Sequence, residues 1–411
     1  MFRAALRSVL ARKVRLLLTG IAILLGVSFM SGSYVLTDTM TRAFDDLIET
    51  GYADIDVVVR RENAFTAQTS ALEERDPMPE SVLETVEAVP GVARAVGDVI
   101  GFAQIVDPDT GDVIGTFGPP TIAASWSDLA GFTIQAGAQP QSENEVAIDS
   151  GTAEANDIAV GDRLQILFEG PPGEFEVVGI ATYGEGGSLF GATYALFDLP
   201  TAQRALGREG ELDAVSVVGE EGEPGQALAE RIDEALPEGI EAVPASTVVT
   251  EQQDQIGQNL GFLRTAFLVF AFVALFVGAF IIFNTFAITV TQRTRELALF
   301  RALGATGRQV MGSVVIEAVV VGLVSSAVGV LGGIGLAIGL KGLLSAIGID
   351  LPASGTVIQL RTIVVSILVG TIVTTIAAIV PARRAARIAP VEALREAQDR
   401  PGRSLRFRLV T

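Results

Sequence analysis

Four long apolar runs dominate the hydrophobic pattern of this chain, at residues 16–36, 262–290, 310–340 and 362–380. A helix that rises ~1.5 Å per residue needs about 20 apolar residues to cross a ~30 Å hydrocarbon core. The pattern therefore predicts four transmembrane helices. A cleaved signal peptide is the alternative for the first run, but the run is long for one and residues 31–34 form a weak cleavage site.

The polar stretch at residues 37–261 predicts a separate α+β domain. Helical patterns at 37–50 and 246–261 continue the first two apolar runs out of the membrane, the second as a stalk. Short strands with glycine-bearing turns predict a β-rich insert at about 117–197. Around it we expect a split βαβ-like subdomain, with strands at 54–59, at 92–96 or 99–105, at 214–218 and at 240–243, and helices at 80–89 and 225–236.

Charge is segregated along the chain. The first 15 residues carry five Arg and Lys, residues 291–310 carry four Arg and residues 382–411 carry eight Arg, whereas residues 37–261 carry 42 Asp and Glu against nine Arg. Membrane proteins retain Arg and Lys on the cytoplasmic side. We therefore expect residues 1–15, 291–309 and 381–411 in the cytoplasm. The acidic domain and a loop at 341–361 then lie outside, where Lys341 and Arg361 are isolated charges at the ends of spans.

The composition excludes several kinds of chemistry. The chain contains no Cys and no His, so disulfides, thiolate metal sites and hydrolytic triads that need His are absent. No Asp-x-Asp-x-Asp-Gly pattern supports a calcium site in the acidic domain. Carboxylates such as Asp54 and Asp56 are explained by alternation along a strand. An independent membrane enzyme is disfavoured, as is nucleic-acid binding, since the basic regions adjoin the spans.

Small and polar residues mark helix contacts within the spans. The third run holds two repeats that let helix backbones approach closely, Gly329-x-x-x-Gly333 and Gly335-x-x-x-Gly339. Asn284, in the second run, is expected to form an interhelical hydrogen bond rather than to belong to a transport site. Glu317, about two turns into the third run, must face protein or water. An arginine of the preceding loop is its expected partner.

Between the second and third runs lies a basic amphipathic segment, residues 292–309. At helical spacing one side carries Ala298, Leu299, Ala302 and Leu303. The other side carries Arg293, Arg301 and Arg308, with Leu297 among them. Gly304 and Gly307 allow the chain to turn. A helix of this kind either lies at the membrane interface or docks on a protein partner.

Two segments resemble the permease family that includes MacB, FtsX and the lipoprotein-releasing LolC and LolE. They are Gln-Arg-Thr-Arg-Glu-Leu-Ala-Leu-Phe-Arg-Ala-Leu-Gly-Ala-Thr at 292–306 and Pro-Ala-Arg-Arg-Ala-Ala-Arg-Ile-Ala-Pro-Val-Glu-Ala-Leu-Arg at 381–395. Looser similarity at 89–92, 143–149 and 160–162 covers the outer domain. The resemblance implies the type VII, mechanotransmission fold, with one span, a large extracytoplasmic domain and three further spans.

The resemblance also implies a function. In this family two units dimerise, and ATP-driven closure of cytoplasmic ATPases moves the outer domains, which exports or extracts lipids, lipoproteins, peptides or drugs. This chain has no Gly-x-x-x-x-Gly-Lys-Ser/Thr phosphate loop, so two copies of a partner ATPase are expected to bind ATP and Mg²⁺ while the chain itself binds no cofactor. The residues expected to couple to that ATPase are Arg295, Glu296, Leu299, Ala302, Leu303 and Gly304.

Several alternatives stay open. The partner protomer is either an identical chain or a paired homologue, and the basic tail is either an end or a linker into a second copy of the unit. An FtsX-like role, in which the outer domain activates a cell-wall hydrolase, is the alternative to transport. The size of the outer domain favours transport. In both cases the chain is expected in the plasma membrane of a bacterium.

Overall fold

The computed structural model describes residues 13–62, 75–107, 111, 113–114, 121–168, 170–184, 192–346 and 355–387. The predictions for residues 1–12 and 388–411 lie outside the described residues. The chain forms two compact units. The helical unit comprises residues 1–38, 261–339 and 356–411, and the α+β unit comprises residues 39–260 and 340–355.

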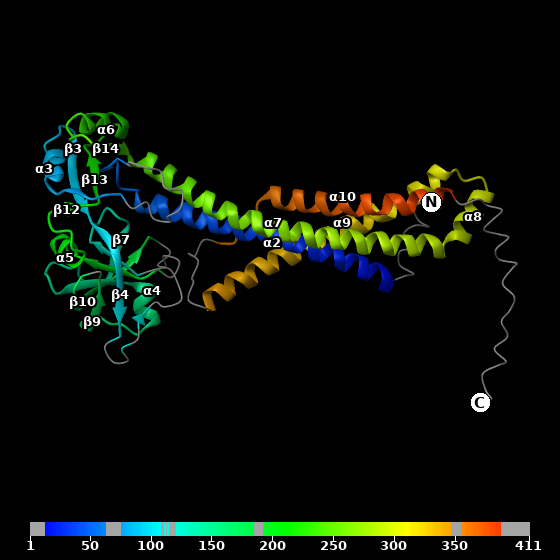
Figure 1. Ribbon diagram of the computed structural model, residues 1–411, viewed down its shortest axis with the longest axis horizontal. Helices are drawn as coiled ribbons and strands as arrows, with labels where there is room; N and C mark the ends of the chain where they lie inside the picture. The colour runs from blue at the N-terminus through cyan, green and yellow to red at the C-terminus, as the bar shows by residue number, and fades with distance from the viewer. Residues whose placement is uncertain are drawn as a thin grey trace. The chain divides into compact units, whose positions relative to one another are not determined.

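Four helices are long and apolar enough to cross a membrane, as the hydrophobic pattern predicts. They are α2 (Lys13–Gly51), α7 (Ala245–Gln292), α9 (Gly307–Ala346) and α10 (Leu360–Arg387) (Figure 1). Helices α2 and α7 continue without a break into residues 39–51 and 245–260 of the α+β unit, so the predicted helical extensions of both runs are confirmed. A proline often ends a helix, but α10 continues through Pro381 to Arg387.

Close backbone contact holds α2 against α9. Ser28 Oγ donates a hydrogen bond to the Gly329 carbonyl oxygen at 2.8 Å. A Cβ placed on Gly333 would lie 2.6 Å from the Ser28 carbonyl oxygen and 2.7 Å from the Gly32 nitrogen, so only glycine fits there. The first predicted small-residue repeat is thus a helix contact. The second repeat is not, because a Cβ on Gly335 or Gly339 would meet no described atom within 4 Å.

A four-stranded sheet with two helices forms the first part of the α+β unit. Its strands and helices are β1 (Val57–Arg61), α3 (Ser81–Glu87), β3 (Val92–Asp98), β13 (Ala214–Gly219), α6 (Gly225–Asp233) and β14 (Ile240–Pro244). The strand order is β14-β1-β13-β3, and every neighbouring pair is antiparallel. Because β13 lies between β1 and β3, and β1 between β13 and β14, each βαβ unit has a strand of the other between its own two strands. The β-rich part interrupts this subdomain between β3 and β13, as predicted. Strands β2 (Met78–Pro79) and β12 (Glu211–Leu212) form a separate two-stranded sheet. In the chain, β2 directly precedes α3 and β12 directly precedes β13.

The residues between β3 and β13 form a closed barrel. Strand β9 pairs with both β4 and β10, which closes the path β4-β6-β11-β8-β10-β9 into a ring. The strands and helices are β4 (Ile100–Val106), β5 (Val113–Ile114), β6 (Thr121–Ser125), β7 (Phe132–Gly137), β8 (Glu145–Asp149), α4 (Ser150–Ala155), β9 (Arg163–Leu167), β10 (Gly173–Tyr183), β11 (Tyr194–Phe197) and α5 (Leu199–Ala205). The β-rich part therefore begins at Ile100 rather than near residue 117, because the strand left open at 99–105 belongs to it.

A polar joint links the two parts of the α+β unit where β3 passes into β4. The Val99 amide donates to Ser125 Oγ at 3.0 Å, and the Ile100 amide donates to Asp213 Oδ2 at 2.8 Å. Asp98 Oδ2 accepts a 2.6 Å hydrogen bond from Ser216 Oγ. Surrounding protein desolvates Asp98 and raises the pKa of this carboxyl to about 6, although the residue keeps part of its surface in solvent.

We predict opposite outcomes for two nearby glycines. Gly333→Ala should destabilise the helical unit by about 1–3 kcal/mol, because the new methyl group overlaps backbone atoms of α2 that cannot move aside. Gly335→Ala is the matched control and should leave stability within about 0.5 kcal/mol. Thermal denaturation of the detergent-solubilised chain measures both. Equal midpoints for the two variants would contradict this account of the α2–α9 contact.

A second prediction concerns Asp98. Because its pKa is raised in the folded chain, the carboxyl stabilises the α+β unit most when protonated, below about pH 4. That stabilisation is lost as pH rises through about 6. Asp98→Asn should flatten this dependence by on the order of 1 kcal/mol, allowing for solvent screening. Trp126, the single tryptophan of the chain and part of this unit, reports unfolding by fluorescence. If the free energy of unfolding depends on pH in the same way in both proteins, Asp98 does not have the raised pKa described here.

Candidate functional site

The segment between the second and third spans forms a short helix, α8 (Thr294–Ala302). Its end is fixed locally: Gly304 takes a φ of 100°, its amide donates to the Arg301 carbonyl oxygen, and the Ala305 amide donates to that of Phe300. The next helix begins at once. Thr306 and Gln309 cap α9 reciprocally, each amide donating to the other side chain. Thus α8 is a separate helix bounded by a sharp turn, as the glycine at 304 predicts.

One face of α8 packs on the bundle and the other is exposed. Leu297 is buried in the hydrophobic core that α7, α9 and α10 share, and Ala298 is fully buried. Leu299, Phe300 and Leu303 are 54%, 44% and 79% exposed. The predicted grouping was therefore wrong for two residues: Ala298 does not share a face with Leu299, and Leu297 does not lie on an outer basic face. Tertiary contact with α9 and α10 selects the buried face, which helical spacing alone cannot do.

The six residues predicted to couple to an ATPase all lie on exposed surface. They are Arg295, Glu296, Leu299, Ala302, Leu303 and Gly304. Sequence reasoning omitted Phe300, although it stands beside Leu299 and is also exposed. Phe300 could have been predicted from the sequence, because it is a large apolar residue in a basic segment outside the spans. This exposed apolar set, Leu299, Phe300 and Leu303, is called the α8 apolar face below.

Two polar contacts fix α8 to the spans. Arg293 Nη1 forms an ion pair with Glu317 Oε2 at 2.9 Å, and Glu317 is only 8% exposed. The prediction that an arginine of the preceding loop pairs with Glu317 is confirmed. At the other end of the helix, Arg301 Nη1 donates to the Ala386 carbonyl oxygen of α10 at 3.2 Å. Helix α8 is thus joined by polar contacts to both α9 and α10.

Two other polar predictions for the spans need correction. Arg361 is not isolated, because its Nη2 pairs with Asp38 Oδ1 at 2.6 Å, and Asp38 is almost fully buried. Asn284 is exposed on α7 and makes no interhelical hydrogen bond with the described residues. The face of α7 that carries Asn284 is not covered by a described helix of this chain, so no partner is within reach. Near the same end as Arg361, the Arg264 guanidinium lies 5.3 Å from the centre of the Tyr34 ring.

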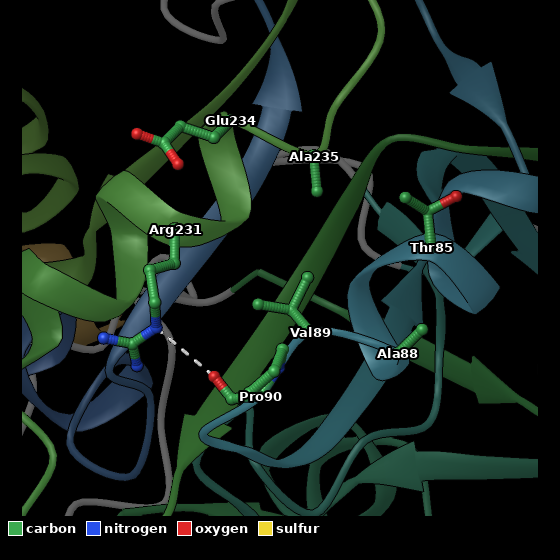
Figure 2. A pocket seen from close by; sticks show the side chains of 7 residues that line it. All are labelled: Thr85, Ala88, Val89, Pro90, Arg231, Glu234 and Ala235. Atoms are coloured by element: carbon green, nitrogen blue, oxygen red, sulfur yellow. Dashed lines mark hydrogen bonds between the residues drawn. The ribbon is translucent and has the colours of Figure 1, made fainter.

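The α+β unit offers a groove but no recognisable reactive group. A shallow groove of about 430 Å³ lies between α3 and α6 and includes Thr85, Val89 and Ala235 (Figure 2). Its one cation, Arg231, already donates to Glu223 and to the Pro90 carbonyl oxygen. Among the described residues, no group of three or more Asp and Glu could hold a metal ion. Chemistry therefore does not identify a ligand for this groove.

Comparisons with known proteins agree with this architecture. Residues 16–235 match the model of the MacB-like periplasmic core domain, and residues 268–390 match that of the FtsX-like permease C-terminal domain. An uncharacterized ABC transporter permease of Mycobacterium tuberculosis is 28% identical over 277 residues, which cover 66% of this chain and 30% of that protein. A probable export ATP-binding/permease protein MacB of Pseudomonas entomophila is 30% identical over 197 residues, 47% of this chain and 28% of that one.

Solved structures of similar proteins include the periplasmic region of MacB from Actinobacillus actinomycetemcomitans, with a TM-score of 0.37 and 12% identity over 49% of this chain and 94% of that one. The chain spans about a third or less of the length of the M. tuberculosis and P. entomophila relatives. One family model alone covers more than half of the 411 residues, and the two together overlap all four candidate spans. The chain therefore belongs to the MacB/FtsX-type family of ABC transporter permeases.

Proposed function

We propose that this permease couples ATP hydrolysis by a separate partner ATPase to movements of its α+β unit, and that the ATPase docks on the α8 apolar face. The permease itself carries out no catalysis. ATP and Mg²⁺ bind to the partner, in two copies for a pair of permease protomers. The spans lie in a bacterial plasma membrane with α8 inside and the acidic α+β unit outside, because Arg is concentrated around α8 and carboxylates around the other unit.

The observation that carries this proposal is the exposure of Leu299, Phe300 and Leu303 on a helix that is otherwise firmly held. Each large apolar side chain gains about 1.5–3 kcal/mol when it moves from water into a protein contact. The alternative, burial in lipid, is less favourable for α8 because Arg295 and Glu296 lie on exposed surface of the same short helix. A protein surface with an apolar pocket and a charged rim accommodates both sets of residues.

We further propose that the cargo is a lipid, lipoprotein, peptide or drug that is exported or extracted. The P. entomophila relative is named as a probable export protein, which supports this direction. The second candidate is an FtsX-like signalling role, favoured by the match to an FtsX-like permease domain. Capture by the full chain in lipid nanodiscs distinguishes the two. A cell-wall hydrolase bound in an ATP-dependent manner supports signalling, and a lipid or peptide bound in that manner supports transport.

Leu303→Asp should abolish stimulation of the partner ATPase while the chain stays folded, because Leu303 makes little contact with its own chain. Loss of one apolar contact alone weakens docking about tenfold or more, and burying the new carboxylate weakens it further. The assay is ATPase activity of the reconstituted pair across a titration of permease. Leu303→Met keeps an apolar side chain of similar size and serves as the control. Full stimulation by Leu303→Asp would argue strongly against docking on this face.

Glu317→Gln should lower both thermal stability and maximal ATPase stimulation. The change removes the buried carboxylate and leaves the Arg293 guanidinium with the exposed Glu296, at a cost of about 1.5–3 kcal/mol. The double variant Arg293→Gln, Glu317→Gln removes both charges and should recover most of the stability but not the stimulation, since α8 is still untied from α9. Additive losses of stability in the double variant would show that the two side chains do not act as a pair.

A further inference from the structure

The α+β unit is attached to α7 at a point where strand passes directly into helix. Strand β14 ends at Pro244 and α7 begins at Ala245, with no intervening loop. The Ala245 amide donates to the Asp56 carbonyl oxygen at 2.9 Å, which joins the first turn of α7 to the start of β1. Val248, one turn further, is buried in a cluster with Val58 of β1. The first turns of α7 thus lie against the sheet, on the face opposite the α3–α6 core to which Val57 and Val59 point.

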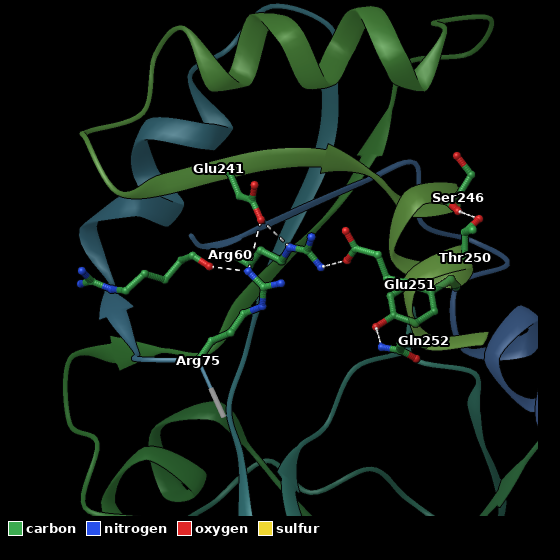
Figure 3. Close-up of polar contacts among 9 residues, drawn as sticks. Arg60, Arg75, Glu241, Ser246, Thr250, Glu251 and Gln252 are labelled. Carbon is green, nitrogen blue, oxygen red and sulfur yellow. Dashed lines mark hydrogen bonds and ion pairs between the residues drawn. The ribbon is translucent and has the colours of Figure 1, made fainter. Parts of the chain in front are cut away.

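Four charged side chains reinforce this attachment (Figure 3). Arg60 of β1 extends on the same face as Val58, and its side chain is only 9% exposed. Its Nε contacts Glu241 Oε1 of β14 at 2.9 Å, and its Nη1 contacts Glu251 Oε2 of α7 at 2.6 Å. Arg75 Nη1 lies 3.2 Å from the same Glu241 oxygen and donates to the Arg61 carbonyl oxygen at 2.7 Å. We call these residues, Arg60, Arg75, Glu241 and Glu251, the Arg60 cluster.

The geometry of the Arg60 cluster favours one position of α7 along the four-stranded sheet. Apolar contact is non-directional, so a helix that packs on a sheet through Val248 alone could shift along its axis at little cost. A guanidinium held by two carboxylates from different elements has one favoured geometry, because its donors lie in a rigid plane. Arg60 is buried but Glu251 is 46% exposed, so the pair adds little stability and acts mainly by favouring one position of the helix. The cluster therefore fixes where α7 sits along the sheet.

The end of α2 has no comparable contact within the described residues of the α+β unit. Tyr183 Oη donates to the Leu47 carbonyl oxygen at 2.9 Å, which ties α2 to the barrel. Gln252 of α7 donates to Tyr52 Oη at 2.9 Å, beside the end of α2. Neither of these contacts is an ion pair. Of the two helices that enter this unit, α7 is the one that forms an ion pair with the four-stranded sheet among the described residues, between the buried Arg60 and the half-exposed Glu251.

We propose that the Arg60 cluster is the mechanical joint that makes the first turns of α7 and the four-stranded sheet move as one body. The proposal rests on the proposed function, in which α7 carries a displacement produced by the ATPase. Glu251 is the positioning residue of the joint: it belongs to α7, and Arg60 and Glu241 belong to the sheet. Without Glu251, the sheet keeps its own Arg60–Glu241 pair while α7 retains only the Ala245 and Val248 contacts.

The first test measures the joint itself and needs no ATPase. The chain contains no cysteine, so Glu230→Cys on α6 and Gln258→Cys on α7, both at exposed positions, accept spin labels selectively. In nanodiscs the full chain should give one narrow distance distribution. Adding Glu251→Gln should broaden it at least twofold, whereas Glu143→Gln, which breaks the exposed Arg204–Glu143 pair of the same unit, should not. Equal widths for all three proteins overturn the proposal, whatever the ATPase does.

The second test asks whether the joint transmits motion. Hydrogen exchange is compared between nucleotide-free and ATP-trapped states of the reconstituted pair. Wild type and Glu143→Gln should show nucleotide-dependent changes in α7 and in β1 and β14. With Glu251→Gln, ATPase stimulation and the changes in α7 should persist, while those in β1 and β14 fall by more than half. Unchanged transmission in this variant refutes the joint, whereas failure of wild type to stimulate the ATPase refutes only the proposed function. The Trp126 unfolding midpoint verifies that every variant is folded.

Discussion

The close approach of α2 and α9 is the contact on which the helical unit depends. Lipid tails are as apolar as leucine, so apolar side chains do not drive helices together in a membrane, and close backbone packing must do so. Glycine at 329 and 333 of α9 permits that approach, and Gly370 of α10 lies against Val27 of α2. Helix α2 is consequently the most enclosed span, with 56% of its most apolar window buried, whereas α7 has 22%.

Helix α7 has an ion pair near each of its ends. At one end Arg60 pairs with Glu251, and at the other Arg293 pairs with Glu317. Both contacts join a guanidinium to a carboxylate on a different element, and in both one partner is buried. In each pair the arginine also contacts a second carboxylate, Glu241 for Arg60 and Glu296 for Arg293. Helix α7 is thus held by an ion pair near each end and by buried side chains such as Ile282 and Phe286 between them.

In the α+β unit, the strands of a closed barrel are inserted in the chain between β3 and β13 of a four-stranded sheet. The barrel leaves the sheet after β3 and returns before β13, and both crossings lie at one polar joint. There Asp213 and Ser125 satisfy the amides of Ile100 and Val99, which the change of sheet would otherwise leave unpaired. The continuity of the four-stranded sheet, and hence of the surface that α7 grips, depends on this joint.

The sequence by itself determined the four spans, the split βαβ pattern, the separate helix at 294–302 and an arginine partner for Glu317. These features follow from local periodicity, from turn residues such as Gly304 and from the cost of leaving a carboxylate unpaired in a span. Only the tertiary structure decided that β9 closes the barrel, that Gly333 but not Gly335 meets another helix, and that Arg361 pairs with Asp38, 323 residues away. Each of these depends on which distant segments meet, and residue type or spacing within one segment carries no information about that.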